Sequence, residues 1–188
     1  MKNNAVKKLV TMGMLAALSI ALAYLVHFPI FPSAAYLEYD MADIPILIGS
    51  FMFGPISGLI LTAIVAVIQG VTVSAQSGWV GIVMHFIATG ALAITVGTIY
   101  RLKSDRVGAV LALVAGTLVM TALMIPLNLI FTVHFNGVPR EAVVAMLGPI
   151  IIPFNLIKAG VNSVLAFGVF KALSGILGIG RKKQQGAA

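Results

Sequence analysis

The run VGAVLALVAGTLVMTALMIPLNLIFTV, residues 107–133, contains no charged side chain. A membrane-spanning α-helix needs ~20 consecutive apolar residues, so this run is long enough to cross a bilayer with some tilt. Pro126 near its end predicts a kink, which membrane helices tolerate where neighbouring groups satisfy the freed backbone. The basic segment RLKSDR, residues 101–106, precedes the run directly. The sequence therefore predicts a transmembrane helix over about residues 106–133.

The composition supports the same class for the whole chain. Hydrophobic residues make up 60% of the 188 residues and charged residues only 9%, against roughly a quarter in an ordinary soluble domain. The lipid bilayer must cover much of this apolar surface, and the length leaves room for one membrane domain, residues 1–188. The net charge of +7 is spread between the apolar runs, which argues against nucleic-acid binding. The absence of cysteine excludes disulfides, thiolate metal sites and a cysteine nucleophile.

Five further apolar runs complete a prediction of six transmembrane helices in an all-α fold. They cover about residues 6–27, 42–53, 55–74, 79–101 and 150–174. Gly54-Pro55 separates the second run from the third, which predicts a tight helical hairpin. An outer loop, residues 28–41, is rich in proline and aromatic residues. In the outer segment, residues 134–149, a short interfacial helix could begin at Pro139.

The distribution of charges predicts the orientation of the helices. Lysine and arginine near short loops favour the cytoplasmic side of a membrane. With six spans, one side carries Lys2, Lys7, Lys8, Arg101, Lys103, Arg106, Lys171, Arg181, Lys182 and Lys183, and the other carries Glu38, Asp40, Asp43 and Glu141. Among the basic residues, only Arg140 and Lys158 depart from this pattern. Both termini are therefore predicted to be cytoplasmic, whereas five spans would place the C-terminal basic cluster outside. The sequence has no convincing internal repeat, so an inverted-repeat carrier has no direct support.

The most informative polar side chain is Lys158, which lies inside the sixth span. Burying a lysine there costs ~2.5–3.5 kcal/mol on insertion scales, so a compensating interaction is needed. Asn155 and Asn162 share a helical face with Lys158, because they lie about one turn before and after it. Together they predict an inward polar stripe that binds a ligand. The alternative is that Lys158 pairs with Asp40 or Asp43 while the asparagines join helices.

Other residues are candidates for the same site. Asn128, beside the predicted kink, offers an amide to the interior, although an interhelical hydrogen bond is an equal alternative. Tyr36 and Tyr39 offer flat surfaces for an aromatic ligand, and their loop could act as a lid; the alternative is an aromatic belt at the membrane interface. Asp43, at the entry to the second span, completes the predicted ligand contacts. His85 stands alone in the fourth span, which favours helix packing over metal binding, and no metal site is expected.

Small residues recur every fourth position in the first span, at Gly13, Ala17 and Ala21. This spacing leaves a smooth groove in which another helix can approach closely. The partner could be another subunit or a helix of the same chain, and the spacing does not choose between them.

Three motifs give the chain a resemblance to a known family. They are Tyr39-Asp-Met-Ala-Asp-Ile-Pro45 with Phe53-Gly-Pro55 after it, Asn155-Leu-Ile-Lys158 in the last span, and Ala17-x-x-x-Ala21 in the first. Over nearly its whole length the chain resembles the substrate-binding S component of an energy-coupling factor (ECF) vitamin transporter, and the riboflavin-specific branch in particular. The segment 68–78 departs from that branch, which bears on the identity of the vitamin.

The resemblance implies a function and the residues that carry it. A six-helix protein of the prokaryotic cell membrane would bind riboflavin from outside and dock on a membrane scaffold subunit, the T component, to which two ATPases attach. Asn155, Lys158 and Asn128 would contact the vitamin, and Ala17 and Ala21 would form the docking surface. This chain itself would hydrolyse nothing and would need no cofactor.

Other functions stay open on the residues alone. Folate carries two carboxylates and would call for more basic groups than Lys158 in the pocket. An autonomous secondary carrier would take up its vitamin without ATPase partners, and a purely structural subunit would tolerate the loss of Lys158. An intramembrane enzyme would need a nucleophile and base, or paired carboxylates, inside the spans, but the acidic residues lie at span ends or in loops.

Overall fold

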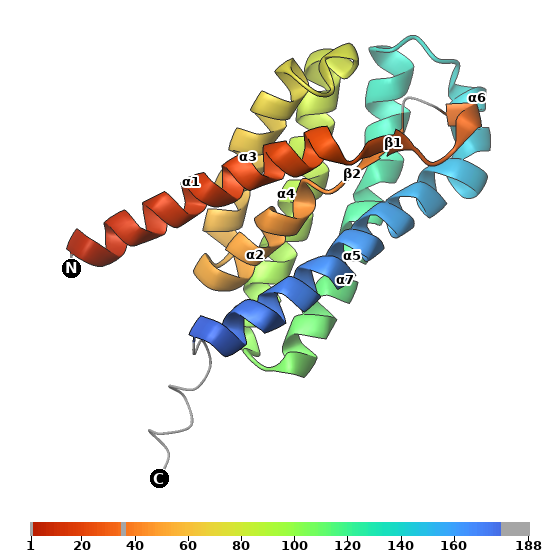
Figure 1. The fold of residues 1–188 in the computed structure, drawn as a ribbon. Coiled ribbons are helices and arrows are strands. Elements are labelled where there is room, and N and C mark those ends of the chain that lie inside the picture. The colour runs from red at the N-terminus through yellow and green to blue at the C-terminus, as the bar shows by residue number, and fades with distance from the viewer. Residues whose placement is uncertain (1, 35–36, 178–188) are drawn as a thin grey trace.

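The computed structural model describes residues 2–34 and 37–177 and is helical apart from one small hairpin of strands (Figure 1). Six helices form a bundle and one short helix, α6, lies between the last two. They are α1 (Lys2–Leu25), α2 (Asp43–Phe53), α3 (Pro55–Val71), α4 (Gly78–Leu102), α5 (Arg106–Leu127), α6 (Arg140–Met146) and α7 (Ile152–Leu177). The predicted all-α class is confirmed, and each predicted span contains one helix.

Four helical stretches of the described residues are long and apolar enough to cross a membrane. They are Asn4–Leu25, Ala75–Leu102, Arg106–Thr132 and Arg140–Ser174. Helices α2 and α3, with 11 and 17 residues, are shorter than the ~20 residues of a full crossing. Four of the six predicted spans therefore contain a helix long enough to cross a membrane. That α2 and α3 also cross it stays a prediction.

The turn between α2 and α3 depends on Gly54. Its φ of 87° lies in the left-handed region that favours glycine, and its N–H donates to the carbonyl of Ser50 at 2.9 Å. Pro55 then opens α3 at a position where no N–H is needed. Nη2 of Arg101 donates to the carbonyl of Phe53 at 2.9 Å, which ties the turn to the end of α4. The tight helical hairpin predicted from Gly54-Pro55 is thus present.

Helix α2 lies at the centre of the bundle. Ile44, Leu47 and Phe51 are buried together with apolar residues of α4, α5 and α7. The Phe51 ring stacks on Phe170 of α7, with centroids 4.7 Å apart, and meets the edge of Tyr100 at 4.9 Å. A short helix enclosed by protein needs an apolar surface all round, which explains its continuous hydrophobic sequence.

Helix α1 packs against α2 and α3 along one face only. Met12, Ala16 and Ala23 are buried in a cluster with Ile46 of α2 and Leu61 of α3. The N-terminal end of α1 projects beyond the other helices (Figure 1). The opposite face of α1 is therefore left open.

The outer loop forms a two-stranded hairpin that sequence reasoning did not predict. Strand β1 (His27–Pro29) pairs antiparallel with β2 (Glu38–Asp40). The strands are only three residues long because Pro29 cannot donate a ladder hydrogen bond and a 3-10 turn follows, η1 (Pro32–Ala34). Without a longer alternating run, the strand signal is too weak to read from sequence.

Helices α5 and α7 both border widened turns at the same end of the bundle as the hairpin. Pro126 lies inside α5, and the chain continues as the π-helical turn η3 (Asn128–Thr132). A second π-helical turn, η4 (Leu147–Ile151), joins α6 to α7. Such turns re-aim side chains and are frequent at functional sites. Helix α6 itself begins directly after Pro139, where the sequence predicts a short helix.

Candidate ligand-binding site

A cavity of about 150 Å³ lies where β2 meets α3, α4, α5 and α7. Its wall combines carboxylates, amides, a lysine and a histidine with apolar side chains. The lining includes Leu37, Glu38, Asp40, Ala66, Gln69, Met84, His85, Thr89, Met120, Met124, Phe154, Asn155 and Lys158. A concave, largely apolar wall with a few convergent polar groups is typical of a small-molecule site.

Lys158 supplies positive charge to this cavity and is held by the strand hairpin. Its Nζ lies 2.8 Å from Oδ2 of Asp40 and 3.4 Å from the backbone oxygen of Glu38. The side chains of Lys158 and Asp40 are 12% and 3% exposed. The structure therefore gives Lys158 the partner Asp40 rather than Asp43. Removing either charge of such a buried pair would leave the other unpaired.

Asp40 is fixed by more than the lysine. Its carboxylate also accepts hydrogen bonds from Nε2 of Gln69 at 3.1 Å and from the backbone N–H of Ala42 at 2.9 Å. Burial acts to raise the pKa of the Asp40 carboxyl, but the Lys158 ammonium and the Ala42 N–H outweigh it and lower the pKa to about 2. Asp40 is therefore ionised at neutral pH and holds Lys158 as its counter-ion.

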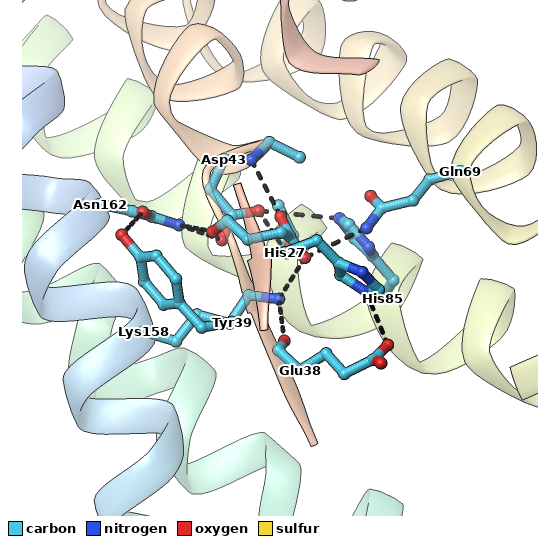
Figure 2. A network of polar contacts seen from close by, with 11 residues as sticks. His27, Glu38, Tyr39, Asp43, Gln69, His85, Lys158 and Asn162 are labelled. Atoms are coloured by element: carbon cyan, nitrogen blue, oxygen red, sulfur yellow. Dashed lines mark hydrogen bonds and ion pairs between the residues drawn. The ribbon is translucent and has the colours of Figure 1, made fainter. Parts of the chain in front are cut away.

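Asn162, Tyr39 and Asp43 form a second polar group that joins the hairpin to the helices (Figure 2). The Tyr39 hydroxyl donates to Oδ1 of Asn162 at 2.9 Å. Nδ2 of Asn162 donates to the backbone oxygen of Asp40 at 2.9 Å and to Oδ2 of Asp43 at 3.3 Å, while Asp43 also accepts from Thr89 at 3.1 Å. Asn162 and Asp43 are fully buried and do not line the cavity. Their geometry positions the hairpin.

The other two asparagines predicted for the site, Asn155 and Asn128, face different hollows. Asn155 lines the cavity of Lys158, and its Nδ2 donates to the carbonyl of Ile151 at 2.8 Å. Asn128 donates to the carbonyl of Met124 at 2.8 Å and lines a larger hollow of about 590 Å³. The two hollows adjoin, since they share the residues Leu37, Glu38, Ser77, Gly81 and Met84. Asn128 is thus brought to the neighbouring hollow rather than beside Lys158.

Sequence reasoning missed Glu38, Gln69 and His85 as residues that line the cavity. Oε1 of Gln69 and Nε2 of His85 are buried and have no hydrogen-bond partner within residues 2–34 and 37–177. Nε2 of His85 lies 3.7 Å from Oδ1 of Asp43, beyond hydrogen-bond distance. His85 therefore lines the cavity and carries a buried ring nitrogen whose hydrogen-bonding capacity is unused among the described residues. The available signal was a lone polar residue in an otherwise apolar helix, which marks a functional candidate in membranes.

The remaining predicted residues lie elsewhere. Gly13, Ala17 and Ala21 are exposed on the open face of α1, and no atom lies within 4 Å of a Cβ built on Gly13. Among the described residues this stripe is not covered by another helix, and docking on a separate subunit stays a prediction. Tyr36 lies outside the described residues.

Comparisons with known proteins agree on one family. The model of the family "ECF transporter, substrate-specific component" matches residues 7–170. The riboflavin transporter FmnP of Bacillus subtilis is 30% identical, over 85% of this chain and 88% of that protein, and the riboflavin transporter RibU of Staphylococcus aureus is 28% identical, over 91% and 92%. A solved structure of the S component of a bacterial ECF transporter superposes with a TM-score of 0.79, at 29% identity, and covers 94% of this chain and 99% of that one.

Proposed function

The chain belongs to the substrate-specific components of ECF transporters, and on this basis we propose that it captures riboflavin outside the cell for delivery to the cytoplasm. Such a component is a multi-pass bacterial membrane protein that binds a vitamin and works with an energising module; it is not an enzyme. Relatives that cover most of the chain are named riboflavin transporters, which favours riboflavin over other vitamins.

The observation that carries the proposal is the pair of adjoining hollows, of which Lys158 lines one and Asn128 the other. Riboflavin has a flat, largely apolar ring with a carbonyl-rich edge and a ribityl chain that bears hydroxyls. Lys158 and Asn155 supply donors suited to the carbonyl edge, and Asn128 supplies an amide suited to the hydroxyls. The larger hollow, about 590 Å³, lies within the ~300–1,000 Å³ range of small-molecule sites.

The charges around the cavity support a ligand without carboxylates. Glu38 and Asp40 both line it, whereas Lys158 is already paired with Asp40. A folate, with two carboxylates, would face these acids without a matching pair of cations. Gln69 Oε1 and His85 Nε2, which have no hydrogen-bond partner among the described residues, add hydrogen-bonding capacity, and we include both residues among the proposed ligand contacts.

The strand hairpin is the proposed lid. Lys158–Asp40 and Tyr39–Asn162 both join it to α7, and the Tyr39 ring packs on Phe28 of β1 with centroids 5.3 Å apart. Tyr39 and Asp43 therefore act by holding the lid rather than by touching the vitamin. On the other side of the molecule, we propose that Gly13, Ala17 and Ala21 dock on a T component that carries two ATPases, with both termini in the cytoplasm.

The first test is the absorbance spectrum of the detergent-purified protein, followed by mass spectrometry of the small molecule released on denaturation. A flavin spectrum with near one riboflavin per chain is the expected result. A colourless protein that also fails to bind added riboflavin would contradict the choice of vitamin and direct the search to folates.

A second test separates an S component from an autonomous carrier. Proteoliposomes that contain this chain alone are expected to bind riboflavin without accumulating it. Accumulation driven by a proton gradient, in the absence of any ATPase, would overturn the proposed dependence on an energising module.

A further inference from the structure

A separate hollow of about 300 Å³ lies on the surface of the bundle between α5 and α7, and it shares no lining residue with the cavity of Lys158. Its wall is almost wholly apolar. The lining residues are Val110, Leu113, Val114, Thr117, Leu118, Gly160, Ser163, Val164 and Phe167. The two hydroxyls among them, on Thr117 and Ser163, lie 3.3 Å apart and bond to each other. We call this hollow the α5–α7 groove.

A glycine and two exposed valines shape the α5–α7 groove. A Cβ built on Gly160 would meet no atom within 4 Å, so this glycine is what opens the floor beside α5. Val114 and Val164 stand on the rims and are 54% and 72% exposed. Because the Thr117 and Ser163 hydroxyls are hydrogen-bonded to each other, the floor presents little polar capacity to an occupant. A slim hydrocarbon chain fits this surface.

Two cations lie beyond the same end of the groove. Arg106 stands four residues before Val110 on α5, and Lys171 stands four residues after Phe167 on α7, so each continues the groove face by about one turn. Both side chains are exposed, and neither forms an ion pair within the described part of the chain. The nearby Asp105 is occupied in capping α5, where its carboxylate accepts from the Gly108 N–H at 2.6 Å. The end of the groove is therefore positively charged.

The spacing of these parts matches a phospholipid. The groove runs from Val110 to Leu118, which is ~12 Å along the helix axis, and Arg106 lies ~6 Å further. One leaflet of a bilayer has a hydrocarbon depth of ~15 Å below its charged headgroups. Basic pockets between membrane helices bind anionic headgroups on the cytoplasmic side. We propose that the α5–α7 groove holds one acyl chain of an anionic phospholipid whose phosphate lies between Arg106 and Lys171.

The test compares lipids that differ only in headgroup charge. The full chain is purified in detergent with equal amounts of phosphatidylglycerol and phosphatidylcholine of the same acyl chains, and retained lipid is counted by native mass spectrometry. Wild-type protein is expected to retain one phosphatidylglycerol, and Arg106→Gln/Lys171→Gln is expected to lower its retention roughly tenfold. The control Lys7→Gln/Lys8→Gln removes equal charge from the proposed cytoplasmic side of α1 and should retain lipid as the wild type does.

A second variant tests the acyl part of the site. Gly160→Leu fills the groove and should lower retention of both lipids, while monodisperse elution and an unchanged thermal unfolding midpoint in detergent show that the variant is folded. Equal retention of the two lipids by the wild type, or unchanged retention by Arg106→Gln/Lys171→Gln, would overturn the proposal. Dimers that form in phosphatidylcholine alone and that Gly160→Leu dissociates would assign the groove to a second copy of the chain. None of these lipid readouts depends on which vitamin is bound.

Discussion

At the scale of single residues, Lys158 has a structural partner and a proposed ligand, and substitution can separate the two. Lys158→Met should weaken riboflavin binding ~10–100-fold, because a hydrogen bond from a charged donor contributes ~1.5–3 kcal/mol. The same change leaves the buried Asp40 carboxylate unpaired, which should cost ~3–5 kcal/mol of stability. Flavin fluorescence quenching measures the binding, and thermal unfolding in detergent measures the stability.

The matched control removes both charges of the pair. Lys158→Met/Asp40→Asn should regain most of the lost stability while riboflavin binding stays weak. Lys103→Met changes an exposed lysine that does not line the cavity, and it should change neither riboflavin binding nor stability. Wild-type binding by the double variant would show that Lys158 serves only to hold Asp40.

The spacing of the polar stripe was enough to predict its inward face but not its partners. Asn155, Lys158 and Asn162 all point into the protein, as a shared helical face requires. The choice between Asp40 and Asp43 depends on where β2 ends and α2 begins, and the short strand gives no sequence signal of that boundary. The same limit applies to Asp43, which was predicted as a ligand contact and which bonds to Asn162 and Thr89 inside the protein.

At the scale of elements, the α2–α3 turn should be sensitive to a single methyl group. Gly54→Ala forces a residue with a Cβ into a φ of 87°, and the new Cβ would overlap the guanidinium of Arg101. We expect a loss of ~1–3 kcal/mol in thermal stability. Gly168→Ala is the control, because its Cβ would enter open space on α7 and should be neutral or slightly stabilising. Equal effects of the two substitutions would contradict the role given to the turn.

The open face of α1 should be needed for assembly and not for capture. Ala17→Leu/Ala21→Leu fills the small-residue stripe and is expected to abolish copurification with the energising module while riboflavin affinity stays within about twofold. Ala122→Leu places the same side chain at an exposed alanine of α5 and should leave assembly intact. Normal assembly of the α1 variant would move the docking surface to another helix.

Helix positions were predictable because lipid demands long apolar runs, and the exceptions have a physical reason. Helices α2 and α3 are apolar yet short, and composition does not show whether protein or lipid covers such a segment. Protein encloses α2, whose residues from Asp43 to Phe51 are all buried. The hairpin β1–β2 escaped prediction because a three-residue strand beside prolines has no measurable period.

At the scale of the whole molecule, opposite charges lie at opposite ends of the bundle. Arg101, Lys103 and Arg106 cluster at the connection between α4 and α5. The strand hairpin, which contains Glu38 and Asp40, follows the C-terminal end of α1. Basic connections favour the cytoplasmic side, so the hairpin and the cavity beneath it are expected on the outer side. A vitamin would then reach the cavity from outside, and the α1 surface would meet its partner within the membrane.

This orientation is open to a direct test because the chain has no cysteine of its own. Ser33→Cys in the outer hairpin and Ser104→Cys in the α4–α5 connection are closely matched replacements at exposed serines. In intact cells, a membrane-impermeant maleimide should label Ser33→Cys, and Ser104→Cys should react only after the membrane is permeabilised. The reverse pattern would place the cavity on the cytoplasmic side, which is incompatible with capture from outside. Labelling of both variants in intact cells would contradict the placement of the two serines on opposite sides of the membrane. That placement is expected because α4, at 25 residues, is long enough to cross a bilayer.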